Sequence, residues 1–545
     1  MSPRSPSLDS VAAAEPPRDD IPRDYNAAAD LLGRHLAAGR GGKVAYIDDT
    51  TSHTFATLAQ RASRVGGGLL SLGLRPEERV ALAMLDTVDW PAAFLGAIGA
   101  GLVPVALNTL LPTRDYEYML GDSRARALLV SAALLPTFSP ILHTLPHLQA
   151  VIVVGDGPLP SLAQAGPRAL TFVDLLSRGT DQLAPARTTR DDACFWLYSS
   201  GSTGQPKGTV HLHSTLRLTA QLYAQPILGI RDDDVVFSAA KLFFAYGLGN
   251  ALSFPLTVGA TTVLCAGRPT PAAVFARLRS HRPTIFYGVP TLYAALLSDP
   301  HFPSRDELAL RICTSAGEAL PAHIGTRFRE RTGVDILDGI GSTEMAHIFL
   351  SNRPGEVRYG TTGRVVPGYR LRVLDDAGQP VRPGEVGDLY ISGPTAAACY
   401  FNQREKSLST FQGEWTKSGD KYWFDDDGYY TYAGRSDDML KVSGMYVSPA
   451  EVEAALGSHP AVLEAAVVGH RDGDGLVKPK AYVVLKPHAD GGDRPDRIDA
   501  DALVHALQDH VKHQLAPYKY PRWIEFLAEL PKTATGKIQR FKLRA

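Results

Sequence analysis

The sequence has few cysteines, and their spacing suggests neither a disulfide framework nor a metal site. The 545 residues contain four cysteines, none in a C-x-x-C pair. Three of them lie in apolar or small-residue runs, which is typical of reduced thiols in the core of a cytosolic protein. This pattern argues against a secreted, disulfide-stapled protein, and we expect a cytoplasmic location. The four residues are Cys194, Cys265, Cys313 and Cys399.

The sequence also lacks an excess of charge of either sign. It has 56 Lys and Arg residues against 57 Asp and Glu residues, so its formal net charge is −1. This balance provides no basic field for nucleic acid and no polybasic or acidic tail. We therefore expect small-molecule partners and no nucleic acid, and the sequence leaves a homodimer open.

Long apolar runs are missing as well. Residues 90–107 carry no charge and approach the length of a membrane span, but prolines and glycines interrupt them. A buried helix followed by a strand at 103–107 fits this pattern better. Residues 1–25 have no apolar h-region, and their acidic, Pro-, Ser- and Ala-rich composition predicts a disordered tail. We expect neither a membrane partner nor export.

The arrangement of apolar runs predicts several structural units. Residues 45–267 and 271–339 alternate β-rich runs with Ala- and Leu-rich helical stretches, which is typical of parallel α/β sheets. Residues 363–432 show short strands separated by Asp- and Gly-containing turns, which indicate a small β-barrel-like subdomain. A new α/β unit begins after Gly434. A chain of this length is expected to form more than one domain.

These units predict an α/β protein with two domains. The large N-terminal domain covers residues 26–434 and contains two α/β subdomains and the small β-barrel-like subdomain. The boundary lies at residues 435–437, and a small α+β C-terminal domain covers residues 438–545. We find no internal repeat.

A loop rich in glycine and hydroxyl groups follows the apolar run at 194–197. It reads Tyr198-Ser-Ser-Gly-Ser-Thr-Gly-Gln-Pro-Lys-Gly208. Glycines allow backbone N–H groups to turn toward an anion, hydroxyls add donors, and Lys207 supplies a mobile positive charge. A Walker motif needs Gly directly before the lysine, whereas Lys207 follows Pro206. The pattern predicts a phosphate-binding loop unlike that of ordinary kinases and ATPases.

Two further loops follow predicted strands, at residues 315–320 and 339–344. Open α/β sheets bind their ligands at the carboxyl ends of strands, where these loops lie. The second loop ends in Thr343 and Glu344, and carboxylate oxygen suits a hard cation that bridges phosphates. Lys537 lies on a Gly-containing loop near the C-terminus, where a lysine without other context is usually a surface residue.

Together with the segments at 417–420, 434–453 and 530–538, these loops resemble the signature motifs of the adenylate-forming superfamily. That superfamily includes acyl-CoA synthetases, peptide-synthetase adenylation domains and beetle luciferases. The resemblance covers nearly all of the chain from about Asn26 onward. It implies an enzyme that activates a carboxylate with ATP and Mg²⁺, releasing pyrophosphate, with CoA as co-substrate.

The resemblance also assigns roles to individual residues. It makes Lys537 the catalytic lysine, Thr343 a contact of the α-phosphate, and Glu344 the Mg²⁺ ligand, with Lys207 as a further charge on the phosphates. It places the ribose hydroxyls against Asp420 and Arg435. ATP binding falls to Ser199, Ser200, Gly201, Ser202, Thr203, Gly204, Ser315, Ala316, Gly317, Glu318, Asp338, Gly339, Ile340, Asp420 and Arg435.

The family rotates its C-terminal domain between two half-reactions. By resemblance, Asp437 is the hinge, and rotation withdraws the lysine and brings a second loop to the site. That loop shapes a tunnel for pantetheine and contains Lys441, Ser443 and Gly444. A mobile C-terminal domain is therefore part of the expected fold.

The acyl pocket departs from many relatives, because Phe244 occupies the position of an aromatic gate that often carries histidine. The segments at 241–250 and 343–350 resemble the benzoate–CoA ligase branch, and an aromatic wall suits a flat ring. A ligase for hydroxybenzoate, aminobenzoate, cinnamate or a medium-chain fatty acid remains an alternative. Two weaker alternatives are an enzyme that transfers the acyl group to a carrier protein and a nucleotide-binding protein that has lost catalysis. The expected pocket residues are Phe244, Ala245, Tyr246, Ala316, Gly341, His347 and Ile348.

The assignment of Lys537 predicts a selective defect. An ammonium group across the reacting oxygens stabilises the charge that develops when a carboxylate attacks the α-phosphate. Lys537→Ala should therefore abolish adenylate formation far more than thioester formation from supplied benzoyl-AMP. The two rates are measured separately, by pyrophosphate release and by thiol consumption. Equal losses in both would contradict a model with two domain orientations.

Overall fold

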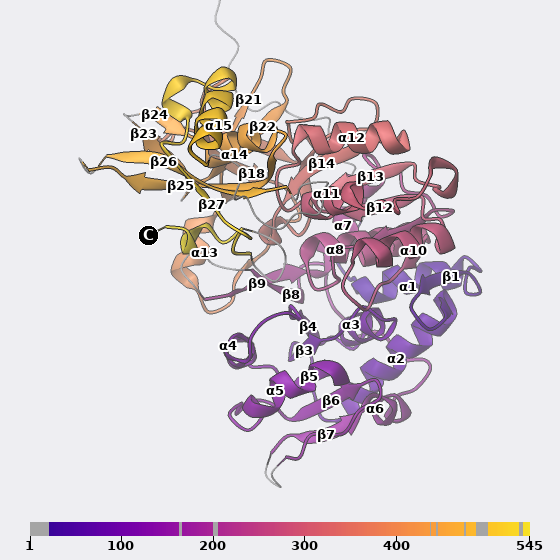
Figure 1. The fold of residues 1–545 in the computed structure, drawn as a ribbon. Coiled ribbons are helices and arrows are strands. Elements are labelled where there is room, and N and C mark those ends of the chain that lie inside the picture. The colour runs from indigo at the N-terminus through magenta and orange to yellow at the C-terminus, as the bar shows by residue number, and fades with distance from the viewer. Residues whose placement is uncertain are drawn as a thin grey trace, which may run out of the picture.

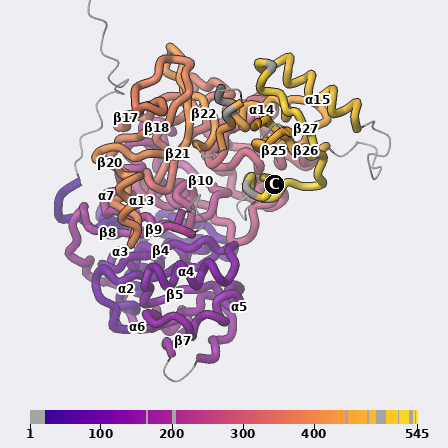
Figure 2. The backbone as a smooth tube through the Cα atoms, turned by 90° about the vertical axis from the view of Figure 1, so that its left-hand side faces the viewer, coloured from indigo at the N-terminus to yellow at the C-terminus, as the bar shows by residue number. Residues whose placement is uncertain are grey.

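The computed structural model describes residues 21–162, 166–199, 205–436, 438–442, 445–473, 476–486, 500–532 and 538–544. Two large sheets form the body of the molecule, and a smaller antiparallel sheet and a C-terminal unit lie beyond them (Figure 1). In both views the C-terminal elements gather at the opposite end of the molecule from β7 (Figure 2). This arrangement confirms the predicted α/β class, with a large N-terminal domain and a small C-terminal one.

The first sheet has eight strands in the order β19-β9-β8-β4-β3-β5-β6-β7. Its strands from β8 to β7 pair in parallel, whereas β9 and β19 add antiparallel partners at one edge. Strands β5 and β6 are buried along their whole length, as expected for a parallel sheet covered on both faces. The bounds are β3 Arg79–Ala83, β4 Val103–Ala106, β5 Ala127–Ser131, β6 Ala150–Val154, β7 Arg168–Thr171, β8 Ala193–Ser199, β9 Lys207–Leu212 and β19 Cys399–Tyr400.

The second sheet has nine strands in the order β16-β15-β14-β13-β12-β10-β11-β1-β2. Strands β10 to β14 and β1 pair in parallel, and β15, β16 and β2 are antiparallel edges. The bounds are β1 Val44–Ile47, β2 Ser52–Thr54, β10 Val235–Ser238, β11 Thr261–Val263, β12 Ile285–Gly288, β13 Ile312–Ser315, β14 Ile336–Gly341, β15 Ile348–Ser351 and β16 Arg364–Val365.

Helices connect and cover these strands, and several begin at side chains that cap them. Asn26 accepts hydrogen bonds from two backbone N–H groups of the first helix, and Thr54 caps the second. The helices are α1 Ala27–Ala37, α2 Phe55–Ser71, α3 Asp89–Gly99, α4 Thr113–Ser123, α5 Leu135–Phe138, α6 Phe172–Arg178, α7 His213–Thr219, α8 Ala245–Leu248, α9 Phe254–Val258, α10 Pro271–His281, α11 Pro290–Ser298 and α12 Ala322–Thr332. The π-helical turn η4 (Gly249–Ser253) joins α8 to α9.

A five-stranded antiparallel sheet occupies the part of the chain predicted to form the β-barrel-like subdomain. Its order is β17-β18-β21-β20, and β22 also pairs with β21. The chain leaves this sheet between β18 and β20 to contribute β19 to the first large sheet. The bounds are β17 Arg370–Leu374, β18 Gly387–Ser392, α13 Arg404–Thr410, β20 Phe411–Gln412, β21 Trp415–Phe424 and β22 Tyr430–Arg435.

The C-terminal unit has a hydrophobic core of its own. Val452, Val467, Val483 and Leu507 are buried together there, and their elements come from this unit alone. Ser448 caps its first helix, and Pro449 occupies the first turn, where the missing N–H costs nothing. The bounds are β23 Leu440–Val442, β24 Met445–Val447, α14 Pro449–Gly457, β25 Val462–Arg471, β26 Val477–Leu485, α15 Ala500–Gln514 and β27 Trp523–Phe526.

The last residues of the predicted N-terminal tail pack into the large domain. Ile21 is 2% exposed and Tyr25 is 7% exposed, and both pack into the core. The Tyr25 backbone N–H donates to the carbonyl oxygen of Thr188 over 3.0 Å. The prediction of a disordered tail is therefore wrong for residues 21–25, and its remainder, residues 1–20, lies outside the described residues.

The prediction that the cysteines are unpaired and mostly buried is confirmed. Cys194, Cys265 and Cys313 are buried free thiols, and Cys399 is half-buried and also free. Residues 89–99 and 103–106 form the expected buried helix and strand. Within the described ranges, no helix combines the length and apolar character needed to cross a membrane.

A buried ion pair at the start of strands β10 and β13 of the second sheet gives a stability prediction. Asp234 is 1% exposed and accepts hydrogen bonds from Arg311 Nε at 2.8 Å and from Thr284 Oγ1 at 2.7 Å. Arg311→Ala leaves this carboxylate buried without its cation, which costs about 3 kcal/mol. We expect a drop of several degrees in the apparent melting temperature, measured by differential scanning fluorimetry.

The control is Arg231→Ala, which removes an exposed pair with Asp233. Exposed ion pairs contribute little, so this variant should melt close to the unaltered protein. Equal melting temperatures for the two variants would show that the buried pair does not stabilise the second sheet.

Candidate active site

Four short elements bring polar side chains together where the two large sheets meet. β8 ends at Ser199 and β9 begins at Lys207, and these two residues are partners in the antiparallel register. Glu344 lies in the 3-10 turn η6 (Thr343–Met345) directly after β14. Tyr400 ends β19, which pairs with β9. The side chains of Ser199, Lys207, Glu344 and Tyr400 are called the charged cluster below.

One carboxylate oxygen organises the charged cluster. Glu344 Oε1 accepts a hydrogen bond from the Tyr400 hydroxyl at 2.7 Å and one from Ser199 Oγ at 3.3 Å. Lys207 Nζ lies 3.7 Å from the same oxygen and donates to the Tyr400 hydroxyl at 3.2 Å. The ammonium also lies 4.3 Å from the centroid of the Tyr400 ring. A cation and an anion therefore share one small, half-buried space.

The surroundings keep Glu344 ionised. Burial favours the neutral acid, but the charge of Lys207 and the hydrogen bonds from Tyr400 and Ser199 outweigh it and hold the pKa of Glu344 below its usual range. Burial lowers the pKa of Lys207, and Glu344 offsets part of that effect. Burial and the neighbouring carboxylate raise the pKa of Tyr400, so its hydroxyl stays a donor. A carboxylate and a lysine together suit a metal-bound polyphosphate.

His211 fixes the turn that carries Glu344. Its ring nitrogen Nε2 donates to the Thr343 carbonyl oxygen at 2.8 Å. The ring stacks on Phe195 with centroids 4.9 Å apart, and burial lowers its pKa to about 4. An uncharged histidine thus anchors η6 to β9.

The predicted adenine and phosphate loops lie on neighbouring strands. Ser315 ends β13, and its partner in the parallel register is Asp338 on β14. Within the described part of the chain, Ser315 Oγ and Asp338 Oδ1 are buried without a hydrogen-bond partner. Burial raises the pKa of Asp338 well above its usual range. Unsatisfied buried polar atoms at a strand end are suited to a polar ligand.

Other predicted ATP contacts follow from the same strands. Ala316, Gly317 and Glu318 follow β13, and Gly317 has φ +95°, a conformation that favours glycine. Gly339 and Ile340 belong to β14 itself.

Asp420 and Arg435 face each other on the antiparallel sheet. They are register partners on β21 and β22, and Arg435 Nη1 donates to Asp420 Oδ1 at 3.0 Å. The charge of Arg435 contributes to the lowered pKa of Lys207, which places this pair near the charged cluster.

A buried aromatic group surrounds His347, three residues beyond Glu344. Its Nε2 lies 3.2 Å from the Tyr246 carbonyl oxygen and 3.2 Å from Asn250 Oδ1. The Phe254 ring is 4.4 Å from the His347 ring, measured between centroids. Burial lowers the pKa of His347 to about 3, so the ring is neutral at pH 7.

The neighbouring backbone leaves this ring little freedom. A Cβ atom at Gly249 would lie 2.2 Å from His347 Cδ2. At Gly341 it would lie 2.5 Å from the His347 carbonyl oxygen. The Tyr246 hydroxyl also shares a hydrogen bond with Thr314 Oγ1 at 2.5 Å. The segment containing Phe244, Ala245 and Tyr246 thus lies against the loop that carries His347 and Ile348.

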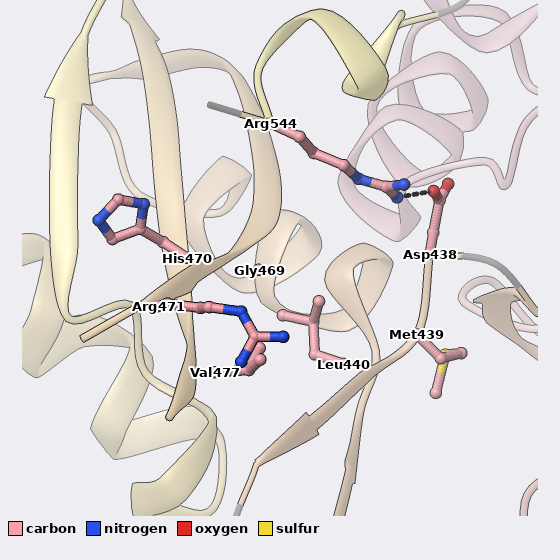
Figure 3. Close-up of a pocket in the computed structure, with 8 residues that line it drawn as sticks. All are labelled: Asp438, Met439, Leu440, Gly469, His470, Arg471, Val477 and Arg544. Atoms are coloured by element: carbon pink, nitrogen blue, oxygen red, sulfur yellow. Dashed lines mark hydrogen bonds and ion pairs between the residues drawn. The ribbon is translucent and has the colours of Figure 1, made fainter. Parts of the chain in front are cut away.

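Part of the predicted site lies outside the described residues, namely Lys537, Asp437, Ser443, Gly444 and residues 200–204. Lys441 belongs to β23. The chain resumes at Asp438, where a cavity of about 310 Å³ opens beside β25. Figure 3 shows the Asp438 carboxylate and the Arg544 guanidinium pointing toward one another, whereas the His470 ring points away from them.

Sequence reasoning missed Tyr400, His211 and Asn250. Tyr400 stands on a two-residue strand far from the recognised loops, and His211 carries no local motif. Asn250 ends the segment at 241–250, but a single asparagine gives no signal of its contact with His347. Within the described ranges, no three His, Cys, Asp or Glu side chains form a cluster that could hold a metal ion.

Two family models match the chain. The model of the AMP-binding enzyme family matches residues 34–401, and the model of the AMP-binding enzyme C-terminal domain matches residues 451–537. The second match lies within the C-terminal unit, which has a separate hydrophobic core.

Relatives match nearly the whole chain. A benzoate–CoA ligase of Thauera aromatica is 62% identical over 532 residues, which are 97% of this chain and 98% of that protein. The crystal structure of a benzoate CoA ligase from Burkholderia xenovorans LB400 is 56% identical, with a TM-score of 0.86, over 96% of this chain and 100% of that one. An anthranilate CoA ligase in complex with anthranoyl-AMP is 46% identical, with a TM-score of 0.89, over 96% of this chain and 97% of that one.

The charged cluster predicts a change in lysine reactivity. Because Glu344 offsets the effect of burial on Lys207, Glu344→Gln should lower the pKa of Lys207 further. Each pKa unit lost raises the fraction of neutral, reactive amine about tenfold. We expect faster labelling of Lys207 by an amine-reactive ester at pH 7, measured by peptide mass spectrometry.

Lys480 serves as the internal control, because its hydrogen bond to Glu525 raises its pKa and lies in the C-terminal unit. Its labelling rate should be the same in both proteins. Unchanged or slower labelling of Lys207 would show that Glu344 does not stabilise its charge.

Proposed function

The chain belongs to the AMP-binding enzyme family, and from this membership we propose that it is an AMP-forming benzoate–CoA ligase. It converts benzoate, ATP and CoA to benzoyl-CoA, AMP and pyrophosphate through benzoyl-AMP. The observation that supports this most is the loop at 342–348, which carries Glu344 of the charged cluster at one end and His347 of the aromatic group at the other. Phosphate chemistry and an aromatic pocket thus meet on one short segment.

The first half-reaction forms the adenylate. A benzoate oxygen attacks the α-phosphorus, a new P–O bond forms, and the bond to pyrophosphate breaks. In our proposal Lys207 and the loop at 199–204 hold the leaving phosphates, while Thr343 and Lys537 stabilise charge on the α-phosphate. The Ser315 loop and Asp338 receive the adenine, and Asp420 and Arg435 receive the ribose.

The donor set also fits a magnesium ion carried by the triphosphate. Glu344 is ionised, and Mg²⁺ is commonly held by one or two carboxylates together with substrate phosphates. We assign this ligand role to Glu344. The bound ion would supply charge neutralisation on the phosphates.

The second half-reaction transfers the benzoyl group to CoA. The thiol sulfur attacks the carbonyl carbon, its proton leaves to solvent, and AMP departs with the bonding electron pair. We assign the hinge to residues 435–437, with Asp437 as its pivot. Rotation of the unit at 438–545 would replace Lys537 with the loop that contains Lys441, Ser443 and Gly444.

Benzoate suits the aromatic group around His347. The buried imidazole of His347 is neutral, so an apolar benzoate ring could pack against it without an uncompensated charge. Because its Nε2 is already occupied by Tyr246 and Asn250, His347 closes the pocket and forms no ion pair with the substrate carboxylate. Phe244, Ala245, Ala316, Gly341 and Ile348 complete the proposed wall.

A second acid remains a candidate. Two relatives point to alternatives. A 4-hydroxybenzoate–CoA/benzoate–CoA ligase of Rhodopseudomonas palustris is 52% identical over 96% of this chain, which favours hydroxybenzoate as one alternative. The structural similarity to an anthranilate CoA ligase favours an aminobenzoate as another. A cytoplasmic enzyme acting on small molecules, as a monomer or a homodimer, completes the proposal.

Pyrophosphate release across a panel of acids tests the proposal. With ATP and Mg²⁺, benzoate should give the highest kcat/KM, and sustained turnover should require CoA. Anthranilate should be slower by about tenfold or more, because an added polar group in an apolar pocket leaves hydrogen bonds unmade.

Highest activity with anthranilate would retain the chemistry and overturn the benzoate assignment. No release with any acid would overturn the ligase proposal. Acetate serves as the control acid, since it lacks a ring to fill the pocket.

A further inference from the structure

Tyr400 belongs to neither the predicted site nor the loops that carry it, yet it lies at the centre of the charged cluster. The residue is 3% exposed. Its strand β19 extends from the segment that links β18 to α13 and pairs with β9 of the first large sheet. The segment between β18 and α13 thus contributes one side chain to the charged cluster, whose other members come from the two large sheets.

The hydroxyl of Tyr400 stands between two opposite charges. It donates to Glu344 Oε1 at 2.7 Å and accepts from Lys207 Nζ at 3.2 Å. Lys207 Nζ remains 3.7 Å from that carboxylate oxygen, beyond the 2.7–2.9 Å or so of a charge-assisted hydrogen bond. The Tyr400 ring occupies one side of the ammonium, at 4.3 Å. The two charges are therefore near one another without being directly hydrogen-bonded.

We propose that Tyr400 is a positioning residue that separates Lys207 from Glu344, so that both charges remain available to ATP and its metal ion. This inference rests on the proposed function, because it assumes that the charged cluster receives the triphosphate. Without the hydroxyl, Lys207 would move onto Glu344 as a direct ion pair. That pair would then have to break before either side chain could reach the nucleotide.

The backbone around Tyr400 holds the hydroxyl in this place. The Phe401 N–H donates to the Gly208 carbonyl oxygen at 2.8 Å, next to Lys207. The Ala397 N–H donates to the Glu344 carbonyl oxygen at 2.8 Å. Ser407 Oγ accepts from the Tyr400 N–H at 3.0 Å. The strand is thus fixed to both charged residues that its side chain separates.

Equilibrium binding of ATP in the absence of an acid substrate tests the role without relying on turnover. Isothermal titration calorimetry in EDTA reports the contact of Lys207 with the phosphates. Tyr400→Phe should weaken ATP binding by about tenfold, because a direct ion pair competes with the nucleotide. In Mg²⁺ the same variant should need a higher metal concentration for half-saturation.

Tyr25→Phe is the matched control. Its hydroxyl also donates to a carboxylate, Asp30 Oδ2, at 2.7 Å. Tyr25 lies in the large domain, directly before the N-cap residue of α1. Tyr25→Phe should bind ATP as the unaltered protein does. Comparable melting temperatures for the two variants would show that Tyr400→Phe is folded.

A double-mutant cycle tests the separation itself. In a Lys207→Met background no ammonium can move onto Glu344, so Tyr400→Phe should change ATP binding in EDTA by less than about twofold. An undiminished tenfold effect in that background would overturn the proposal, as would unchanged binding by Tyr400→Phe alone. If Tyr400→Phe does not fold, Ser407→Ala replaces it, and unchanged ATP affinity would then overturn the proposal.

The outcome is distinguishable from failure of the proposed function. If the unaltered protein releases no pyrophosphate with any acid, the ligase proposal fails whatever Tyr400 does. If it releases pyrophosphate with benzoate and Tyr400→Phe binds ATP normally, only the positioning role fails.

Discussion

A half-buried carboxylate imposes the central constraint on this structure. Removing the charge of Glu344 from water is costly unless donors and a cation compensate it, and the chain supplies these from Ser199, Tyr400 and Lys207. The two donors and the cation come from three strands of the first large sheet, β8, β19 and β9, whereas Glu344 lies in η6 after β14 of the second. Both large sheets must therefore be correctly placed before this one charge is satisfied, and β19 must reach the first sheet from the segment between β18 and α13. This requirement links the arrangement of subdomains to the chemistry.

The parallel sheets explain why the site forms where it does. Strands β13 and β14 end side by side, so their loops share one edge of the second sheet. The chain turns sharply after η6, where Ala346 has φ +61°, and β15 then returns along β14. This turn directs Glu344 toward the charged cluster and His347 into the buried aromatic group. A single short loop therefore carries one side chain of the charged cluster and one of the buried aromatic group.

Much of the fold could be predicted from the sequence, because the signals are local. The runs at 127–130 and 150–154 became buried parallel strands, and the alternation of strands and helices indicated the right class. Contacts between distant segments produce no local pattern in the sequence. Tyr400 and Asn250 act through partners 56 and 97 residues away, and neither has a motif around it. Ile21 and Tyr25 were assigned to the tail because composition cannot show that these two side chains pack into the core.

The close approach of Gly249 to His347 limits how the proposed acyl pocket could change. The ring rests on bare backbone, so position 249 has no side chain that could be shortened to give more room behind it. Any larger residue there would press the imidazole inward and narrow the pocket. Widening of the proposed pocket would have to come from His347 or from the other residues assigned to its wall. A larger side chain in the η4 turn would therefore disturb packing around His347, so we expect changes that enlarge the proposed pocket to occur at its wall and not behind this ring.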